Sequence, residues 1–230
     1  MLFEFGDRLW VSDGPHVVAA LGFHYPTRMA VARLADGGLF VWSPVALTAA
    51  VRRAIDALGP VAHLVAPNHL HHVFLTDWVQ AYPGAQLWAP PGLARKRGDL
   101  TFDGELAGPT DAPWADDLEQ GTVPGNRITT EVFFFHRPSK TVLVADLVQQ
   151  LPPEFYAGWR AKVARLDLMT AEDPTVPRKF RMMFSDKTAA RQAVDQILAW
   201  PCEQVAFAHG PLVFAHGQTV LTRAFDWLKP

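Results

Sequence analysis

Cysteine is nearly absent from this sequence, and its scarcity excludes several classes of protein. The chain has 230 residues and one cysteine, Cys202, so no disulfide can form within it. Zinc sites and iron–sulfur clusters that need several thiolates are excluded for the same reason. Cys202 follows Trp200–Pro201, and we expect it to be a small buried apolar side chain.

Long hydrophobic runs and an excess of one charge are also missing. No apolar run approaches the roughly 20 residues of a transmembrane helix, and the N-terminus lacks a basic segment followed by an apolar one. The formal net charge is −2, which gives no electrostatic reason to expect nucleic acid or a membrane as a partner. These absences favour a cytoplasmic protein whose partner is a small-molecule substrate.

Two common catalytic motifs are missing as well. Gly37–Gly38, Gly121 and Gly125 lack the strand–GxGxxG–helix context of a phosphate-binding loop, and we interpret them as turn residues. No serine lies in a G-x-S-x-G elbow. The sequence therefore supports neither a dinucleotide-binding loop nor a serine hydrolase.

The pattern that is present predicts alternating strands and helices. With 49% hydrophobic and 11% aromatic residues, we expect one compact domain, residues 1–230, with a substantial core. The periodicity predicts strands over 9–12, 28–34, 39–43, 62–66, 86–89, 128–136, 141–145 and 204–208. It predicts helices over 48–58, 74–82, 154–166, 187–200 and 214–228. Residues 90–125 are expected to form a long surface loop and 178–181 a solvated basic loop.

Three histidines follow one short buried strand, Ala62–Ala66. His69, His71 and His72 lie within four positions, directly after Pro67–Asn68. An irregular loop lets successive side chains converge, whereas a strand would alternate them between its two faces. Imidazole is the commonest neutral metal ligand near neutral pH. This stretch is therefore the first candidate for a metal site.

Other predicted strands also end on residues that can bind metals. The strand 141–145 ends on Asp146, 204–208 ends on His209, and 128–135 ends on His136. Because strand ends on one edge of a sheet are neighbours in space, we expect these side chains to converge with the histidine cluster. Histidines with one carboxylate suit Zn²⁺ first, and also Fe²⁺ or Mn²⁺. We expect one divalent ion.

Three segments resemble the metallo-β-lactamase superfamily. They are VAPNHLHH (Val65–His72), FFFHRPSKTVLVADL (Phe133–Leu147) and VAFAHG (Val205–Gly210). Their order and separation match that superfamily's histidine-rich motif, third histidine, bridging aspartate and last histidine. The resemblance implies an α/β fold of αββα sandwich type, with two mixed sheets face to face. The chain looks most like a divergent branch in which Pro-Asn precedes a His-His pair.

The full superfamily motif, His-x-His-x-Asp-His, does not occur here, and two registers are possible. In the first, Pro67 and His71 replace the first histidine and the aspartate, so that His72 joins Asp146 and His209 as a core ligand. His71 is then the fourth ligand, and His69 and His136 belong to the neighbouring site. In the second, His69 and His71 bind with His136, and Val73 and Phe74 remove the other site. We prefer the first register, because the lengths of the preceding strand and following helix match it.

The resemblance implies a metal-dependent hydrolase. The ion would lower the pKa of a bound water, so that hydroxide attacks an ester, amide or phosphoester. Asp146 and His72 are the predicted catalytic residues. Because the motif is incomplete, a catalytically degenerate member that serves as a binding or scaffold protein is the alternative. An iron protein with redox chemistry is a third hypothesis.

Overall fold

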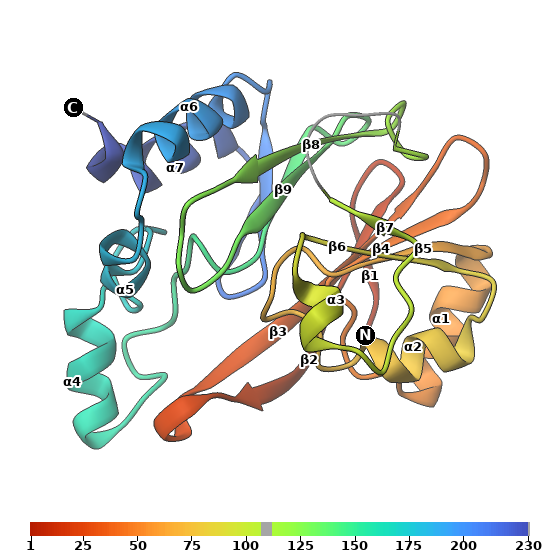
Figure 1. Ribbon diagram of the computed structural model, residues 1–230, viewed down its shortest axis with the longest axis horizontal. Helices are drawn as coiled ribbons and strands as arrows, with labels where there is room; N and C mark the ends of the chain where they lie inside the picture. Colours follow the sequence, from red (N-terminus) through yellow and green to blue (C-terminus); the bar gives the residue numbers. More distant parts are fainter. Residues whose placement is uncertain (107–111, 230) are drawn as a thin grey trace.

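The structure, a computed structural model, describes residues 1–106 and 112–229. The first of its two sheets has seven strands that follow one another in chain order (Figure 1). They are β1 (Phe3–Gly6), β2 (Leu9–Val18), β3 (His24–Arg33), β4 (Leu39–Trp42), β5 (Val61–Val65), β6 (Gln86–Ala89) and β7 (Gly104–Glu105). Strands β1 to β4 pair antiparallel, and β4 to β7 pair parallel.

The second sheet has five strands in the order β12-β11-β10-β9-β8. They are β8 (Leu118–Val123), β9 (Glu131–His136), β10 (Thr141–Val144), β11 (Gln204–Phe207) and β12 (Leu212–Val213). Only the β10–β11 pair is parallel. The carboxyl ends of β10 and β11 therefore lie side by side, which brings the residues that follow them to one edge of the sheet.

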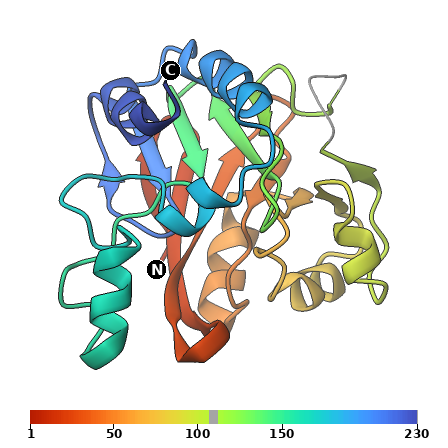
Figure 2. The ribbon, with the colours of Figure 1, turned by 60° about the vertical axis from the view of Figure 1, so that its left-hand side comes forward.

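Helices cover the outer faces of both sheets (Figure 2). The α-helices are α1 (Ala49–Leu58), α2 (Leu75–Ala81), α3 (Leu93–Lys96), α4 (Gly158–Leu166), α5 (Arg178–Met182), α6 (Lys187–Leu198) and α7 (Gly217–Ala224), with 3-10 helices η1 (Ala20–Gly22) and η2 (Asp226–Leu228). α1 and α2 pack on the first sheet, and α5, α6 and α7 pack on the second. A third apolar layer, which includes Phe40, Trp42, Phe134 and Leu143, fills the space between the sheets. This confirms the predicted αββα sandwich.

Local sequence signals set several element boundaries. Thr48 caps α1 by accepting a hydrogen bond from the backbone N–H of Val51, and Asp186 caps α6 in the same way through Ala189. The β3–β4 hairpin turns at Asp36, whose Oδ1 accepts the N–H of Gly38 at 2.8 Å, while Gly37 has a φ of +89°. These elements are the ones that the sequence predicts well.

Two predicted loops contain regular structure instead. The segment 90–125 includes α3, β7 and β8, and its residues 107–111 lie outside the described part of the chain. β8 reads LEQGTV and is buried only at its two ends, so it lacks the apolar alternation by which a strand is recognised. The segment 178–181 lies in α5, which is held by the buried Phe180. The single C-terminal helix predicted over 214–228 is divided in the structure into the shorter helices α7 and η2.

No helix in the described ranges is long and apolar enough to cross a membrane.

Trp114 is expected to be a main contributor to the layer between the sheets. Its side chain is 1% exposed, and its ring centroid lies 4.9 Å from that of Phe40 and 5.0 Å from that of Trp88. Trp114→Ala should lower the free energy of unfolding by about 3–5 kcal/mol in urea titrations, because it leaves a large cavity. Leu166→Ala, at a position 66% exposed, is the matched control and should change it by less than about 1 kcal/mol. Equal effects would contradict the layer assignment.

Candidate metal centre

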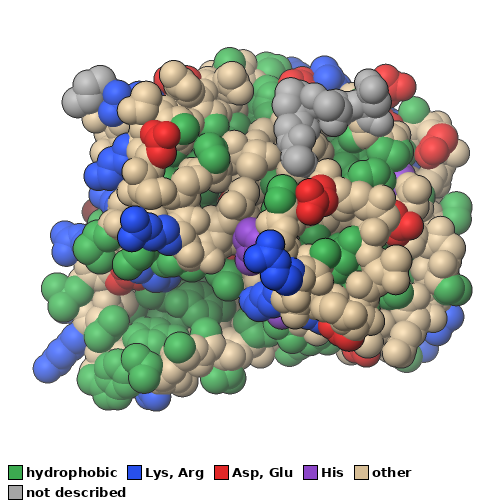
Figure 3. Space-filling view, viewed as in Figure 1, with side chains coloured by type: hydrophobic (Ala, Val, Ile, Leu, Met, Phe, Trp, Pro, Cys, Tyr) green, Lys and Arg blue, Asp and Glu red, His purple; other side chains and the backbone are tan. Residues whose placement is uncertain are grey.

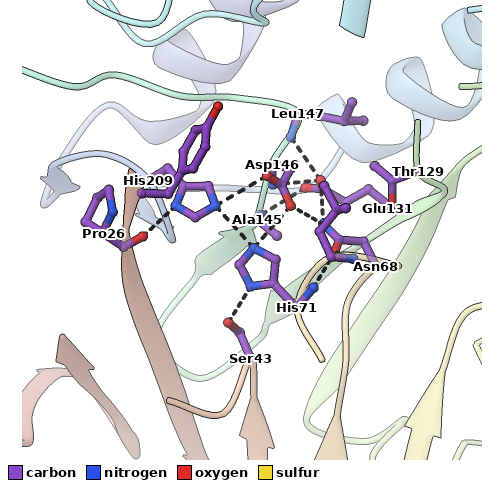
Figure 4. A network of polar contacts seen from close by, with 12 residues as sticks. Pro26, Ser43, Asn68, His71, Thr129, Glu131, Ala145, Asp146, Leu147 and His209 are labelled. Carbon is purple, nitrogen blue, oxygen red and sulfur yellow. Dashed lines mark hydrogen bonds and ion pairs between the residues drawn. The ribbon is translucent and has the colours of Figure 1, made fainter. Parts of the chain in front are cut away.

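Three side chains from three different loops meet at one edge of the sandwich (Figure 4). His71 follows β5, Asp146 follows β10, and His209 follows β11. The Nε2 atoms of the two histidines are 3.2 Å apart, and Asp146 places Oδ2 at 3.1 Å from His71 Nε2 and Oδ1 at 3.3 Å from His209 Nε2. The three side chains are 8, 7 and 4% exposed in chain order. They line a cavity of about 270 Å³.

Asn68 shapes the loop that carries His71. Its side-chain oxygen accepts the backbone N–H groups of Leu70 and His71 at 2.8 and 3.0 Å, which closes a tight turn directly after Pro67. Its side-chain nitrogen donates to Asp146 Oδ2 at 2.7 Å. One fully buried amide therefore fixes both the histidine loop and the carboxylate opposite it.

The hydrogen bonds at the far side of each imidazole control which nitrogen faces the cavity. His209 Nδ1 lies 2.7 Å from the carbonyl oxygen of Pro26. A carbonyl only accepts, so Nδ1 carries the proton and the neutral ring presents a lone pair at Nε2. His71 Nδ1 lies 2.6 Å from Ser43 Oγ, and a hydroxyl can accept as well as donate. Both rings can thus offer Nε2 to an ion with a hydrogen-bond partner at Nδ1, as metal-binding histidines usually do.

Glu131 holds the loop that carries Asp146. It is fully buried at the start of β9, and its two oxygens accept the backbone N–H groups of Ala145, Asp146 and Leu147 at 2.8–2.9 Å. Burial, reinforced by the charge of Asp146, raises the pKa of Glu131 to about 8, although the three backbone hydrogen bonds act in the opposite direction and lower it. The loop is therefore clamped by a second carboxyl group that does not itself face His71 or His209.

Asp146 is the ionised member of this carboxyl pair. Burial alone would raise the pKa of its side chain, but the charges and hydrogen bonds of His71 and His209 hold it well below its usual value. One carboxylate and two imidazoles form a donor set that suits a divalent ion, and Zn, Fe(II) and Mn(II) all accept it.

Arg28 fixes the loop of His209 from the opposite sheet. Its Nη1 atom donates to the carbonyl oxygens of Phe207 and Gly210, both at 2.6 Å, and its Nε atom pairs with Asp13 at 2.7 Å. Two backbone positions flanking His209 are thereby tied to β3 of the first sheet. The site is held in place from both sheets.

The donor atoms fit a metal ion. One donor atom from each of His71, Asp146 and His209 lies within 4.8 Å of the others, and no other cluster of three or more histidine, cysteine, aspartate or glutamate residues in the described ranges does so. Three protein ligands on a cavity wall also match the pattern of catalytic sites, which leave one position open.

The structure corrects the expected place of His72. The preferred register assigns His72 to the group with Asp146 and His209, but His71 takes that place. His72 points away, and its Nδ1 atom lies 3.3 Å from Arg97 Nη1. Burial, together with the charges of Lys96 and Arg97, lowers the pKa of His72 to about 4. Consecutive residues on a tight turn point in different directions, and the turn set by Asn68 selects His71.

His69 is also outside the group. Its Nε2 atom lies 2.9 Å from the carbonyl oxygen of Pro91, and its Nδ1 atom lies 3.3 Å from the backbone N–H of Thr130. The ring therefore bridges two loops beside the centre.

The expectation that His136 joins the site is corrected by the strand pairing. β9 and β10 form an antiparallel hairpin in which His136 pairs with Thr141, the first residue of β10. Asp146 follows the other end of β10, so the two residues lie at opposite ends of the hairpin. His136 is fully buried, and its Nδ1 atom lies 2.7 Å from Ser139 Oγ.

Sequence reasoning missed the residues that orient the candidate ligands: Pro26, Arg28, Ser43, Asn68 and Glu131. Glu131 carried a usable signal, since it is a charged residue inside the apolar run ITTEVFFFH. A buried carboxyl group requires hydrogen-bond partners. Asn68 carried a weaker one, because Pro-Asn indicates a turn.

A family model described as "Domain of unknown function (DUF4336)" matches residues 6–179. The chain belongs to this family. No curated protein shows a significant sequence match to the chain.

Solved structures with the same fold cover nearly the whole chain. A metallo-beta-lactamase from Pontibacter korlensis is 15% identical, with a TM-score of 0.65 over 99% of this chain and 98% of that one. The metal-soaked Flv1 flavodiiron core from Synechocystis sp. PCC6803 is 12% identical, with a TM-score of 0.66 over 99% of this DUF4336 chain and 60% of the other. The metallo-beta-lactamase FIM-1 from Pseudomonas aeruginosa, in its mono-zinc form, is 12% identical, with a TM-score of 0.61 over 100% of this chain and 96% of that one. At these identities the likeness establishes the metallo-β-lactamase fold.

The buried position of His136 predicts a pH dependence of stability. Burial, with the charge of Arg8, lowers the pKa of His136 to about 4 from an ordinary value of 6.5. Between these values the unfolded chain takes up a proton that the folded chain does not, so stability falls as pH drops from 6.5 to 4. Urea unfolding at several pH values measures the decrease in the free energy of unfolding as the pH drops. This decrease should be about 3 kcal/mol smaller in His136→Asn than in the wild type.

His216→Asn is the matched control for this measurement. His216 is exposed with a φ of +59°, a conformation that asparagine tolerates. The free energy of unfolding of His216→Asn should depend on pH in the same way as that of the wild type. Parallel profiles for all three proteins would refute the role given to His136.

Proposed function

We propose that this DUF4336 protein is a metal-dependent hydrolase that holds one divalent ion through His71, Asp146 and His209. The observation that carries the proposal is the convergence of two imidazole nitrogens and a carboxylate around one point on a cavity wall. The names of its fold neighbours, metallo-beta-lactamases among them, support it. Zinc is the proposed ion, with iron and manganese as the alternatives.

A bound ion would supply a Lewis acid that polarises the scissile group and acidifies water. The chain's own residues would hold and orient the reactants. Ser43 and the Pro26 carbonyl fix the two imidazoles at their Nδ1 atoms, and Asn68 and Glu131 fix Asp146 and its loop. Asp146 can also accept a hydrogen bond from water and orient it, since its carboxylate stays ionised.

Tyr25 and Lys179 add polar groups to the cavity wall. The ring of Tyr25 lies 5.4 Å from that of His209, and Lys179 Nζ lies 5.6 Å from the Tyr25 centroid. Burial raises the pKa of Tyr25 above its usual value, so its hydroxyl remains a hydrogen-bond donor at neutral pH. We propose that these two groups orient the substrate beside the ion.

Elemental analysis of protein purified without chelator tests the ligand assignment. The wild type should hold about one equivalent of metal, and His71→Ala, Asp146→Asn and His209→Ala should each hold less than about a tenth of it. His72→Ala and His69→Ala, which change neighbouring imidazoles outside the group, should keep it. Loss in His72→Ala with retention in His71→Ala would overturn the assignment. Circular dichroism checks that each variant is folded.

The hydrogen bonds behind the ligands predict a graded effect. Ser43→Ala removes the partner of His71 Nδ1 and should weaken metal affinity by about 10–100-fold without abolishing binding, as is usual for such partners. Competition with a chromophoric chelator measures the affinity. An unchanged affinity would show that Ser43 does not orient His71.

Metal-dependent turnover tests the reaction class. Hydrolysis of p-nitrophenyl acetate or bis(p-nitrophenyl) phosphate should stop on chelation, return on adding the ion and be lost in Asp146→Asn. Metal that binds without any turnover would argue against a hydrolase. An iron content above the zinc content, with an optical signature, would instead favour the redox alternative.

A binding or scaffold protein without metal is the second candidate. Its supporting observation is the direct 3.2 Å contact between His71 Nε2 and His209 Nε2, which a single shared proton could satisfy. Protein that takes up no metal even after reconstitution would favour this candidate.

A further inference from the structure

The cavity beside the candidate ligands is small and mainly apolar. Its volume is about 270 Å³, slightly below the range of about 300–1,000 Å³ usual for small-molecule sites. Most apolar residues of its wall come from the β2–β3 hairpin, the histidine loop and the segment before β9: Val17, Val18, Leu70, Val73, Phe74 and Ile128. The wall beside the candidate ligands therefore suits an apolar group next to the reacting group of a substrate.

A second cavity of about 480 Å³ adjoins the first, between the β2–β3 hairpin and helices α4 and α5. The two share Ala19, Tyr25 and Lys179 as lining residues. Together they reach a volume typical of ligand sites. We call the pair of cavities the acyl groove.

The outer part of the acyl groove exposes large apolar side chains to water. Leu21 is 75% exposed, Leu166 is 66% exposed and Met182 is 73% exposed. They belong to η1, α4 and α5, and all three line the same cavity. Figure 3 shows apolar side chains gathered at the lower left of this face, where Figure 1 places α4 and the tip of the hairpin. Contiguous exposed apolar surface of this kind marks a binding groove.

Polarity changes along the groove in a definite order. The inner end carries His71, Asp146 and His209, and the junction carries Tyr25 and Lys179. The cation of Lys179 pairs with Asp167 at 3.0 Å, so the junction is close to neutral. Beyond it the exposed lining is apolar apart from Arg178, and it includes Leu21, Leu166 and Met182. A ligand that matches this order has a polar, reactive head and an uncharged hydrocarbon tail.

We propose that the acyl groove binds the hydrocarbon chain of a fatty acyl ester, with its ester group at His71, Asp146 and His209. This inference rests on the proposed function and names its substrate class. In the reaction, the oxygen of water bonds to the acyl carbon and the acyl C–O bond breaks. The leaving alkoxide takes a proton from that water, so that one carboxylic acid and one alcohol form.

Binding of the product acid tests the groove without relying on catalysis. Isothermal titration calorimetry with butyrate, octanoate and dodecanoate should show affinity rising with chain length. Each methylene that is buried contributes about a fourfold gain, so dodecanoate should bind on the order of a hundredfold more tightly than octanoate if the whole chain is covered. A gain below tenfold would overturn the proposal.

Charged substitutions in the outer groove should remove this gain. Leu166→Asp and Met182→Glu alter exposed positions, so both variants should fold, and each should weaken dodecanoate binding by at least about tenfold. Phe214→Asp is the matched control, because Phe214 is 62% exposed and lines neither cavity of the groove. Equal weakening in Phe214→Asp would overturn the proposal.

Kinetics separates this inference from the proposed function. Values of kcat/KM for p-nitrophenyl acetate, octanoate and dodecanoate should rise with chain length, and Leu166→Asp should reduce the dodecanoate-to-acetate ratio by at least about tenfold. Metal-dependent turnover without chain-length dependence would keep the hydrolase and overturn the acyl groove. Chain-length-dependent binding without turnover of any ester would support the groove and overturn the hydrolase.

A second copy of the chain is the competing occupant of this apolar surface. Sedimentation velocity distinguishes it from an acyl chain. The proposal would be overturned if the wild type is a dimer that does not bind dodecanoate and if Leu166→Asp dissociates that dimer. A monomer that binds dodecanoate supports it.

Discussion

Asp146 is held from both sheets, and the geometry of the centre depends on how it is held. Asn68, from the loop after β5, donates to its side chain, and Glu131 at the start of β9 accepts the backbone N–H groups around it. The same Asn68 side chain closes the turn that presents His71. Two buried polar residues thus align loops from different sheets, and in a low-dielectric interior such bonds cannot be lost without cost.

The parts of the fold that follow local rules could be predicted from the sequence. The cap at Thr48, the turn at Asp36 and the apolar spacing of α6 all report on neighbouring residues, so the sequence contains them directly. The convergence of Asp146 and His209 was also predictable, because parallel strands bring their carboxyl ends together. These rules were enough to predict the layers and the neighbourhood of Asp146 and His209, and the candidate ligands that the sequence offered include His71.

The remaining features depend on tertiary contacts that spacing does not encode. The choice of His71 over His72 is made by the Asn68 turn, which also touches Asp146, 78 residues away along the chain. The position of His136 follows from the antiparallel pairing of β9 with β10. β8 is a strand only because β9 pairs with it. The outer cavity of the acyl groove lies where the β2–β3 hairpin meets α4 and α5, which are far apart in the sequence.

A crystal grown with zinc and measured at the zinc absorption edge tests the central claim most directly. The account predicts an anomalous peak within bonding distance of His71 Nε2, His209 Nε2 and an Asp146 carboxylate oxygen, about 2.0–2.2 Å from each. A peak bound instead by His72 or His69, or no peak in crystals whose protein was reconstituted with zinc, would contradict it.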